Sequence, residues 1–398
     1  MMRISTPLLF RQGVDAIQQQ QARLAKTQLQ VATGQRILTP ADDPLGAKRI
    51  LDINELLALN GQYQRHGEAA RRRLAVEESA LEGVDNVLQR IRELAIQGHN
   101  GAYRASDRQA LAVEIGERLE ELLGLANSQD GNNEYLFAGD KVHTQPFVRA
   151  AGGVDYGGDD GRRRLPIAPG YSLALGDAGS AVFMTIANGN GTFVTEAAPS
   201  NVGNGVIDGG TVLQAAQWTG GDYTLVFDDP PDSLQLIDEA AGSSETRSFV
   251  SGEAIRFAGI QVTISGAPQP GDRFSLSPSA HQDMFRTVQN LIEAFNSSSD
   301  AGGGARLSND INRALTDLDQ ALENTRRVRA GIGARLSAID NARQANEDVA
   351  LHLKQTLSEI QDLDYAEAIT RLNQQLAGLQ AAQQSFVRLQ NLSLFNFL

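Results

Sequence analysis

The sequence contains no cysteine among its 398 residues. Without thiols, the chain cannot hold a disulfide framework, a nucleophilic thiolate or a cysteine-ligated zinc or iron-sulfur centre. Basic residues are also scarce, with 35 Lys and Arg against 48 Asp and Glu, which gives a formal net charge of -13. Because phosphate groups bind to cationic surfaces, this excess of acid argues against nucleic acid and anionic lipid as partners.

Long apolar runs are absent as well. No stretch approaches the ~20 consecutive apolar residues that span a bilayer, so we expect no membrane partner. Residues 1–12 turn polar at Arg11 instead of continuing into the apolar core of a cleavable signal peptide. This pattern favours either a cytoplasmic location or export by a route that uses no cleavable signal peptide.

Proline is confined almost entirely to the middle of the chain. Residues 141–280 hold 9 of the 12 prolines and 21 of the 39 glycines, and the only other prolines are Pro7, Pro40 and Pro44. Long helices exclude proline from their interiors, so residues 45–145 and 279–398 can form them. The sequence therefore predicts an α+β fold in which two helical flanks enclose an inserted β-rich segment.

The middle segment shows the two-residue period of half-buried strands. Apolar residues alternate at Tyr223, Leu225 and Phe227 and again at residues 260, 262 and 264, with turn sequences between them. We expect an antiparallel β domain over residues 141–280. This segment carries 8 basic and 15 acidic residues, and so contributes over half of the net negative charge of the whole chain.

The flanks show heptad spacing. A 4-3 alternation over residues 311–339 is interpreted as the core of a helical bundle. Two further seams lie near the chain ends, and each is diluted by glutamine, which sets register at a cost in stability. The N-terminal seam consists of Val14, Ile17, Gln21, Leu24, Gln28 and Val31. The C-terminal seam consists of Ile369, Leu372, Leu376, Leu379, Gln383 and Phe386, and the apolar end adds Leu394 and Phe395.

If the two terminal seams pair, both chain ends lie together and the middle of the chain projects as an inserted domain. Their few apolar positions offset little of the ordering entropy, so neighbouring copies are expected to cover them, and we predict an assembly interface there. Five segments follow: residues 1–44 and 351–398 form a terminal coiled-coil domain, 45–140 and 281–350 a bundle domain, and 141–280 the β-rich outer domain.

Motifs of chemical activity are missing. The five histidines never fall at the His-x-x-x-His spacing, and neither a Gly-x-Ser-x-Gly elbow nor a phosphate-binding loop occurs. Residues 159–164, Asp-Asp-Gly-Arg-Arg-Arg, are interpreted as a solvated hairpin tip, and Asp362 and Asp364 as helix-cap or interface residues. We predict no enzyme activity, no catalytic residue, no metal and no cofactor. An enzyme or adhesin built on the β insert is the weakest alternative.

Both ends of the chain resemble the flagellin and hook-associated protein superfamily. The matching residues are 3–6 (Arg-Ile-Ser-Thr), 32–37 (Ala-Thr-Gly-Gln-Arg-Ile), 40–44 (Pro-Ala-Asp-Asp-Pro), 364–369 (Asp-Tyr-Ala-Glu-Ala-Ile), 379–382 (Leu-Gln-Ala-Ala) and 392–394 (Leu-Ser-Leu). The hook-associated protein 3 branch is the most similar, on residues 135–139, 144–147, 255–274 and 394–398. Since flagellins share the terminal helices, a flagellin-type filament subunit is the alternative.

The resemblance implies a structural adaptor of the bacterial flagellum. Such a subunit joins the hook, through hook-associated protein 1, to the flagellin filament, and forms a homo-oligomeric ring or layer. It is exported to the cell exterior by type III export without a cleaved signal peptide, and an export chaperone grips its C-terminal helix. These partners are expectations from the family.

One internal helix also resembles flagellin. Residues 88–97 (Leu-Gln-Arg-Ile-Arg-Glu-Leu-Ala-Ile-Gln) are similar to the flagellin helix that packs between subunits and that Toll-like receptor 5 recognises. This similarity suggests a subunit-packing or receptor-like patch at Arg90, Leu94 and Glu114. Packing between subunits explains the same residues without a receptor.

Overall fold

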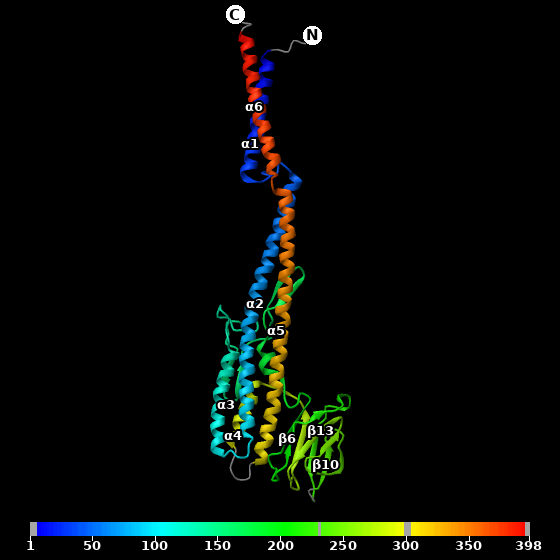
Figure 1. The fold of residues 1–398 in the computed structure, drawn as a ribbon. Coiled ribbons are helices and arrows are strands. Elements are labelled where there is room, and N and C mark those ends of the chain that lie inside the picture. Colours follow the sequence, from blue (N-terminus) through cyan, green and yellow to red (C-terminus); the bar gives the residue numbers. More distant parts are fainter. Residues whose placement is uncertain (1–5, 230–231, 298–303, 395–398) are drawn as a thin grey trace. The chain divides into compact units, whose positions relative to one another are not determined.

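The computed structural model describes residues 6–229, 232–297 and 304–394 (Figure 1). The helices of this part are α1 (Thr6–Thr33), α2 (Pro44–Gly98), α3 (Ala105–Ala126), α4 (Met284–Ser297), α5 (Gly304–Gln361) and α6 (Tyr365–Leu394). Helix α1 ends as expected before Gly34, whose φ of 71° suits a residue without Cβ. Helix α2 begins at Pro44, because proline is tolerated in the first turn.

The strands all lie between α3 and α4. They are β1 (Phe147–Ala150), β2 (Gly153–Tyr156), β3 (Arg164–Ala168), β4 (Tyr171–Ala174), β5 (Ile186–Ala187), β6 (Phe193–Ala197), β7 (Val206–Ile207), β8 (Thr211–Val212), β9 (Tyr223–Phe227), β10 (Ser233–Asp238), β11 (Ser243–Ser248), β12 (Ala254–Phe257), β13 (Ile260–Ser265), β14 (Arg273–Pro278) and β15 (His281–Gln282). Two short helical turns, η1 (Ser180–Met184) and η2 (Ala215–Gln217), interrupt them.

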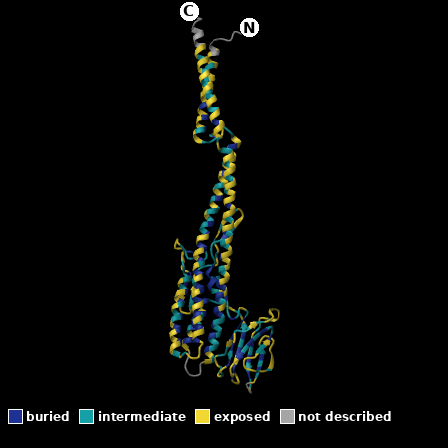
Figure 2. Cartoon of the chain, in the orientation of Figure 1, coloured by how far each residue is buried: buried dark blue, intermediate teal, exposed yellow. Residues whose placement is uncertain are grey.

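Strands β6 to β14 build the antiparallel domain that the alternation predicts. One sheet has the order β11-β10-β9-β14-β6, and β12, β13, β7 and β8 form a second sheet (Figure 1). Strands β9 and β13 bury every second residue, so Leu225, Val262 and Ile264 are completely enclosed (Figure 2). Among the described residues, the buried core cluster of this domain lies between Phe193 and Leu276.

The first half of the β-rich segment belongs to another core. The hairpins β1–β2 and β3–β4 are two-stranded sheets of their own. Phe147 at the start of β1 packs against Phe183 of η1 at 5.1 Å and against Phe285 of α4 at 5.4 Å between ring centroids. The segment between α3 and α4 therefore divides into a part that packs on the bundle helices and a separate β domain.

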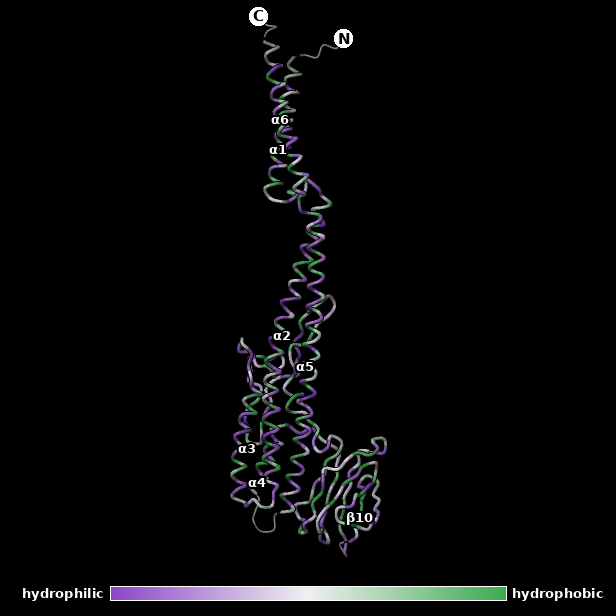
Figure 3. Tube along the Cα trace, viewed as in Figure 1, coloured by the Kyte–Doolittle hydropathy of each residue, from purple (hydrophilic) through white to green (hydrophobic). Residues whose placement is uncertain are grey.

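The bundle helices bury the heptad residues that the sequence indicates. On α2 these include Leu74, Leu81 and Leu88, and on α5 Ile311, Leu318, Ile332 and Ile339, all at most 2% exposed. The interpretation of residues 311–339 as bundle core is confirmed. Figure 3 shows hydrophilic and hydrophobic residues interleaved along the helices, and none of the helices described is apolar over enough length to cross a membrane.

The chain divides into two compact units. Residues 1–65 and 342–398 form one unit, and residues 66–341 form the other, so that α2 and α5 run through both. The first unit contains α1 and α6, and the second contains all strands and helices α3 and α4. The finer division into five segments stays a prediction.

Candidate assembly interface

Helices α1 and α6 lie side by side and antiparallel in the terminal unit (Figure 1). Near one end of the pair, the rings of Phe10 and Phe386 lie 4.8 Å apart. Gly13 packs so closely that a Cβ there would stand 3.0 Å from the Phe386 ring. Farther along, the Gln20 side-chain amide donates to the Gln375 carbonyl at 3.2 Å. The predicted pairing of the terminal seams is thus present within one chain.

On α1, the structure corrects the position of the polar residues in the seam. Leu24 is buried, and Val14, Ile17 and Val31 are half-buried, all as the heptads predict. Gln21 and Gln28 are exposed instead. Gln20 and Thr27 take the polar positions, Thr27 with only 3% exposure. Two heptad phases share residues 17, 24 and 31, and the placement of α6 selects the phase with residues 13, 20 and 27.

On α6, the predicted seam separates into two sets of residues. Leu372, Leu379 and Phe386 are half-buried on the side of α1. The remaining three point outward: Ile369 is 47% and Leu376 38% exposed, and Gln383 is exposed too. Ala368 and Gln375 occupy the corresponding inward positions. The side chain of Leu394 and the whole of Phe395 lie outside the described residues.

The outward set, Ile369, Leu376 and Gln383, recurs every seven residues, and we name it the outer stripe. A heptad stripe with two large apolar residues in solvent is the seam that a further helix would cover. On α1, Leu29 is 54% exposed and adds to the apolar surface of the pair. The arrangement leaves the helix pair one packed face and one face available for neighbouring copies. Its role as an assembly interface stays a prediction.

The turns that connect the terminal pair to α2 and α5 hold each other by backbone hydrogen bonds. The N–H of Arg36 donates to the Gln361 carbonyl at 2.8 Å, and the N–H of Leu363 donates to the Gly34 carbonyl at 2.9 Å. Any Cβ at Gly34 would lie 2.8 Å from the Tyr365 hydroxyl. The two segments that carry the family resemblance therefore meet at these turns, where backbone hydrogen bonds hold them together. They are residues 32–37 and 364–369.

Acidic side chains stabilise the same turns by accepting backbone N–H groups. Asp42 accepts the N–H groups of Leu38 and Thr39 at 3.1 and 3.0 Å and pairs with Lys26 at 2.5 Å. The Lys26 ammonium and these N–H donors lower the pKa of Asp42 to about 2. Asp364 accepts the N–H groups of Ala366 and Glu367 at the start of α6, which confirms its interpretation as a helix cap.

The flagellin-like patch on α2 is only partly at the surface. The Arg90 guanidinium donates to Glu114 of α3 at 2.8 Å and to Glu93 at 3.1 Å. Leu94, in contrast, is completely buried in the bundle. The prediction that Leu94 belongs to a surface patch is therefore wrong, because this residue faces the core together with Ile91 and Ala95. Arg90 and Glu114 stay candidates for subunit packing.

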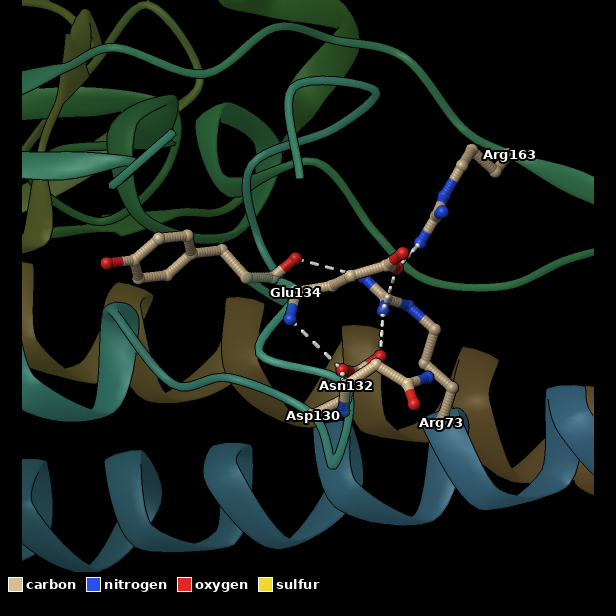
Figure 4. Close-up of polar contacts among 6 residues, drawn as sticks. Arg73, Asp130, Asn132, Glu134 and Arg163 are labelled. Atoms are coloured by element: carbon tan, nitrogen blue, oxygen red, sulfur yellow. Dashed lines mark hydrogen bonds and ion pairs between the residues drawn. The ribbon is translucent and has the colours of Figure 1, made fainter. Parts of the chain in front are cut away.

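A cluster of charges fixes the loop after α3 onto α2 (Figure 4). Arg73 of α2 pairs with Asp130 at 2.5 Å and with Glu134 at 3.3 Å, and it donates to the Tyr135 carbonyl at 2.9 Å. Arg163 pairs with Glu134 at 2.6 Å. The interpretation of residues 159–164 as a solvated tip is thus wrong for Arg163. Its guanidinium completes a structural clamp with Glu134.

Comparison with known proteins places these elements in a family. The model of the bacterial flagellin N-terminal helical region matches residues 4–142, and that of the C-terminal helical region matches residues 315–398. The chain belongs to the flagellin and hook-associated protein superfamily. Within it, flagellar hook-associated protein 3 of Salmonella typhimurium is 25% identical over 394 residues, or 99% of each chain.

Solved structures show the same relationship. A crystal structure of FlgL from Xanthomonas campestris is 32% identical and matches with a TM-score of 0.71 over 77% of this chain and 99% of its own. The crystal structure of flagellar hook associated protein-3 from Legionella pneumophila is 30% identical and matches with a TM-score of 0.74 over 78% and 98%. The flagellin of Listeria monocytogenes aligns over only 33% of this chain and 46% of its own.

Proposed function

We propose that this chain is a structural adaptor subunit of the bacterial flagellum that joins the hook to the flagellin filament. The observation that carries the proposal is the extent of the similarity to hook-associated protein 3, which spans 99% of both chains, including the β domain. A flagellin is similar over a third of the chain. Because flagellins and adaptors share terminal helices, the full-length match separates the two functions.

The partners in this proposal follow from the need for two different contacts. The chain forms a homo-oligomeric layer, with hook-associated protein 1 on one side and flagellin on the other. The outer stripe of α6 supports such packing, since its apolar residues have no covering partner within the described chain. Head-to-tail contacts between its own copies should be poorer than contacts with either neighbour. No enzymatic step is part of this role.

Export is the other part of the proposal. The chain leaves the cell as a flagellar component without removal of a signal peptide, and a chaperone covers the C-terminal helix before export. The amphipathic character of α6 supports this, because an exposed apolar helix face invites aggregation in the cytoplasm. Binding of a groove to one face of α6 would shield it.

Deletion of the gene tests the adaptor function. We expect intact hooks, no filaments and unpolymerised flagellin in the medium. In a second arm, the purified chain is mixed with filament fragments, to which it should add at most a short layer. Long filaments grown from this chain alone would favour the alternative of a flagellin-type subunit.

A further inference from the structure

Asparagine followed by glycine occurs five times in the chain, at Asn60, Asn100, Asn188, Asn190 and Asn204. Such a pair can react with itself, because glycine has no Cβ to shield its backbone nitrogen from the Cγ atom of the preceding asparagine. The reaction needs a glycine N–H that is free of hydrogen bonds and an asparagine side chain that can turn towards it. The structure meets both requirements at one pair and blocks the reaction at the other four.

At two of the blocked pairs, the glycine nitrogen already donates a hydrogen bond. The N–H of Gly189, which follows Asn188, donates to the buried Asp317 carboxylate at 2.6 Å. The N–H of Gly191 donates to the Asn188 carbonyl at 3.2 Å. The Asn190 Oδ1 atom accepts two further backbone N–H groups, so this side chain is fixed as well. Neither pair can form the new bond without first opening the loop.

The other two blocked pairs are enclosed. Asn60 lies in the interior of α2, where its side chain is buried and donates to the Asn346 carbonyl at 3.0 Å. The N–H of the next residue belongs to the hydrogen-bonded helix. Gly205, which follows Asn204, is buried, and a Cβ there would stand 2.9 Å from the Phe274 ring. The Asn204 Oδ1 atom accepts a backbone N–H at 2.5 Å, which holds the side chain in place.

The remaining pair, Asn100 and Gly101, lies in the exposed turn between α2 and α3. The Asn100 Oδ1 atom accepts the N–H of Ala102 at 3.0 Å, a contact inside the turn itself. Among the described residues, neither the Gly101 N–H nor the Asn100 Nδ2 atom has a hydrogen-bond partner. A Cβ at Gly101 would meet open space. The attacking nitrogen and the leaving group are therefore both free.

We infer that Asn100 is a site of spontaneous deamidation. The Gly101 nitrogen forms a bond to the Asn100 Cγ atom and the bond from Cγ to Nδ2 breaks. Ammonia leaves with the proton that the Gly101 nitrogen gives up through solvent. Water then opens the cyclic succinimide at either carbonyl group, which leaves aspartate or isoaspartate at position 100. Because water is the only reactant, the inference goes beyond the proposed function and does not rest on it.

The product changes the turn in two ways. A carboxylate would follow the C-terminal end of α2, where the helix dipole disfavours negative charge. Isoaspartate would also lengthen the backbone of a turn in which the Tyr103 N–H donates to the Asn100 carbonyl at 3.1 Å. The modified chain therefore carries an additional negative charge and can be separated from the unmodified chain by anion exchange.

Peptide mapping of the purified full chain after incubation in mildly alkaline buffer tests the inference. Trypsin releases Asn100 within residues 93–104, because Arg92 and Arg104 flank this peptide. Mass spectrometry measures the loss of asparagine at each pair, in the folded chain and in the chain unfolded by urea. At Asn100 the two rates should be nearly equal, whereas folding should slow the reaction about tenfold or more at the other four pairs.

The variant G101A tests the role of the attacking nitrogen. Its Cβ shields this nitrogen and fits into open space, so the folded chain should lose Asn100 about tenfold more slowly than the wild type. The matched control is G116A, at a glycine of α3 that also has open space around it, and it should leave the rate unchanged.

Two results would overturn the inference. Loss of Asn100 that is as slow in the folded chain as at the four blocked pairs would mean that the turn protects it. Equal and rapid loss at all the pairs of the folded chain would mean that the contacts described above do not select the site. Because the measurement uses the isolated chain, its outcome is independent of the deletion phenotype that tests the adaptor function.

Discussion

The Glu77 carboxyl group of α2 accepts the backbone N–H of Asp177 at 3.0 Å. The Asp177 side chain in turn pairs with Arg335 of α5. Glu77 is 1% exposed, and its Oε2 atom accepts no hydrogen bond within the described residues. Burial and the nearby Asp177 carboxylate raise the pKa of Glu77 to about 8, against the opposing charges of Arg335 and Arg73. The loop after β4 is thus held to α2 by a largely neutral acid and to α5 by the ion pair of Asp177 with Arg335.

This arrangement predicts that stability falls as the pH rises. The folded chain keeps the Glu77 proton up to about pH 8, whereas the unfolded chain loses it near the ordinary pKa of 4.5. The contribution of Glu77 is therefore fully present below pH 4.5 and is lost as the pH rises through 8. The free energy of unfolding should decrease by up to about 1.4 kcal/mol per pH unit between those values. Urea titrations at pH 5 to 9, followed by circular dichroism, measure it.

The E77Q variant isolates this contribution, because glutamine keeps the acceptor for Asp177 and cannot ionise. Its free energy of unfolding should depend less on pH, and above pH 8 it should exceed that of the wild-type chain. E78Q is the matched control, since Glu78 pairs with Arg329 at 2.8 Å near the surface. Equal pH dependence in E77Q and wild type would show that Glu77 does not carry the effect.

The turn around Asp42 predicts the opposite pH dependence. Its pKa of about 2 lies below the ordinary value of 3.8, so its contribution is present above pH 3.8 and is lost as the pH falls through 2. D42N should be less stable than the wild type at pH 7, because the pair with Lys26 is lost. The two chains should converge near pH 2 in the same urea titrations, whereas D52N, at an exposed position, should match the wild type throughout. A constant difference down to pH 2 would contradict the prediction.

A buried aspartate is the key polar contact of the β domain. Asp272, 1% exposed, accepts the N–H groups of Val202, Gly203 and Gln269 at 2.9 to 3.1 Å. D272A leaves these donors without an acceptor, and we expect the domain to lose roughly 2–4 kcal/mol of stability. The single tryptophan, Trp218, packs at 5.5 Å from Phe193 and reports on this domain.

In D272A, the Trp218 fluorescence transition should shift to lower urea, while the helical circular dichroism transition should move little. D222A is the control, since Asp222 is exposed. A common shift of both transitions in D272A would show that the β domain and the bundle unfold as one cooperative unit.

Composition and spacing alone predict the fold class. The confinement of proline to residues 141–280 and the alternation at Tyr223, Leu225 and Phe227 indicate helical flanks and a β domain, and both are present. Local sequence patterns cannot predict contacts between residues far apart in the chain, such as that of Arg335 with Asp177, which are 158 residues apart. For the same reason, the pairing of Arg163 with Glu134 was not predictable from a charged Gly-rich loop.

The terminal seams show where periodicity stops being informative. Ile17, Leu24 and Val31 belong to two heptad phases at once. The residues that distinguish the phases are Gly13, Gln20 and Thr27 in one and Val14, Gln21 and Gln28 in the other, and the one large apolar residue among them, Val14, favours the phase that the structure does not adopt. Only the position of α6 decides between them. On α6, apolar residues occupy both phases, so the sequence could not separate the packed seam from the outer stripe.

The export chaperone gives a prediction for the C-terminal helix. Replacement of Leu376, Leu379 and Phe386 by serine removes apolar side chains from both faces of α6. Chaperone binding to the purified chain, measured by calorimetry, should be abolished, while the Trp218 transition of the β domain stays unchanged. Retained affinity in this variant would place the chaperone site elsewhere on the chain.

The outer stripe and the packed seam can be told apart by paired variants. I369S/L376S changes only outward residues, so the helical signal and the unfolding midpoint of the purified chain should be nearly those of the wild type. L372S/L379S removes half-buried leucines from the contact with α1 and should cost about 1–2 kcal/mol for each.

In a deletion strain, I369S/L376S should nevertheless fail to restore filaments and swimming, because its copies lack the apolar surface for their neighbours. N373S, at an exposed position outside the stripe, should restore both. If I369S/L376S restored swimming to the wild-type level, the outer stripe would not be part of the assembly interface. The heptads of α6 would then serve only to pack this helix against α1.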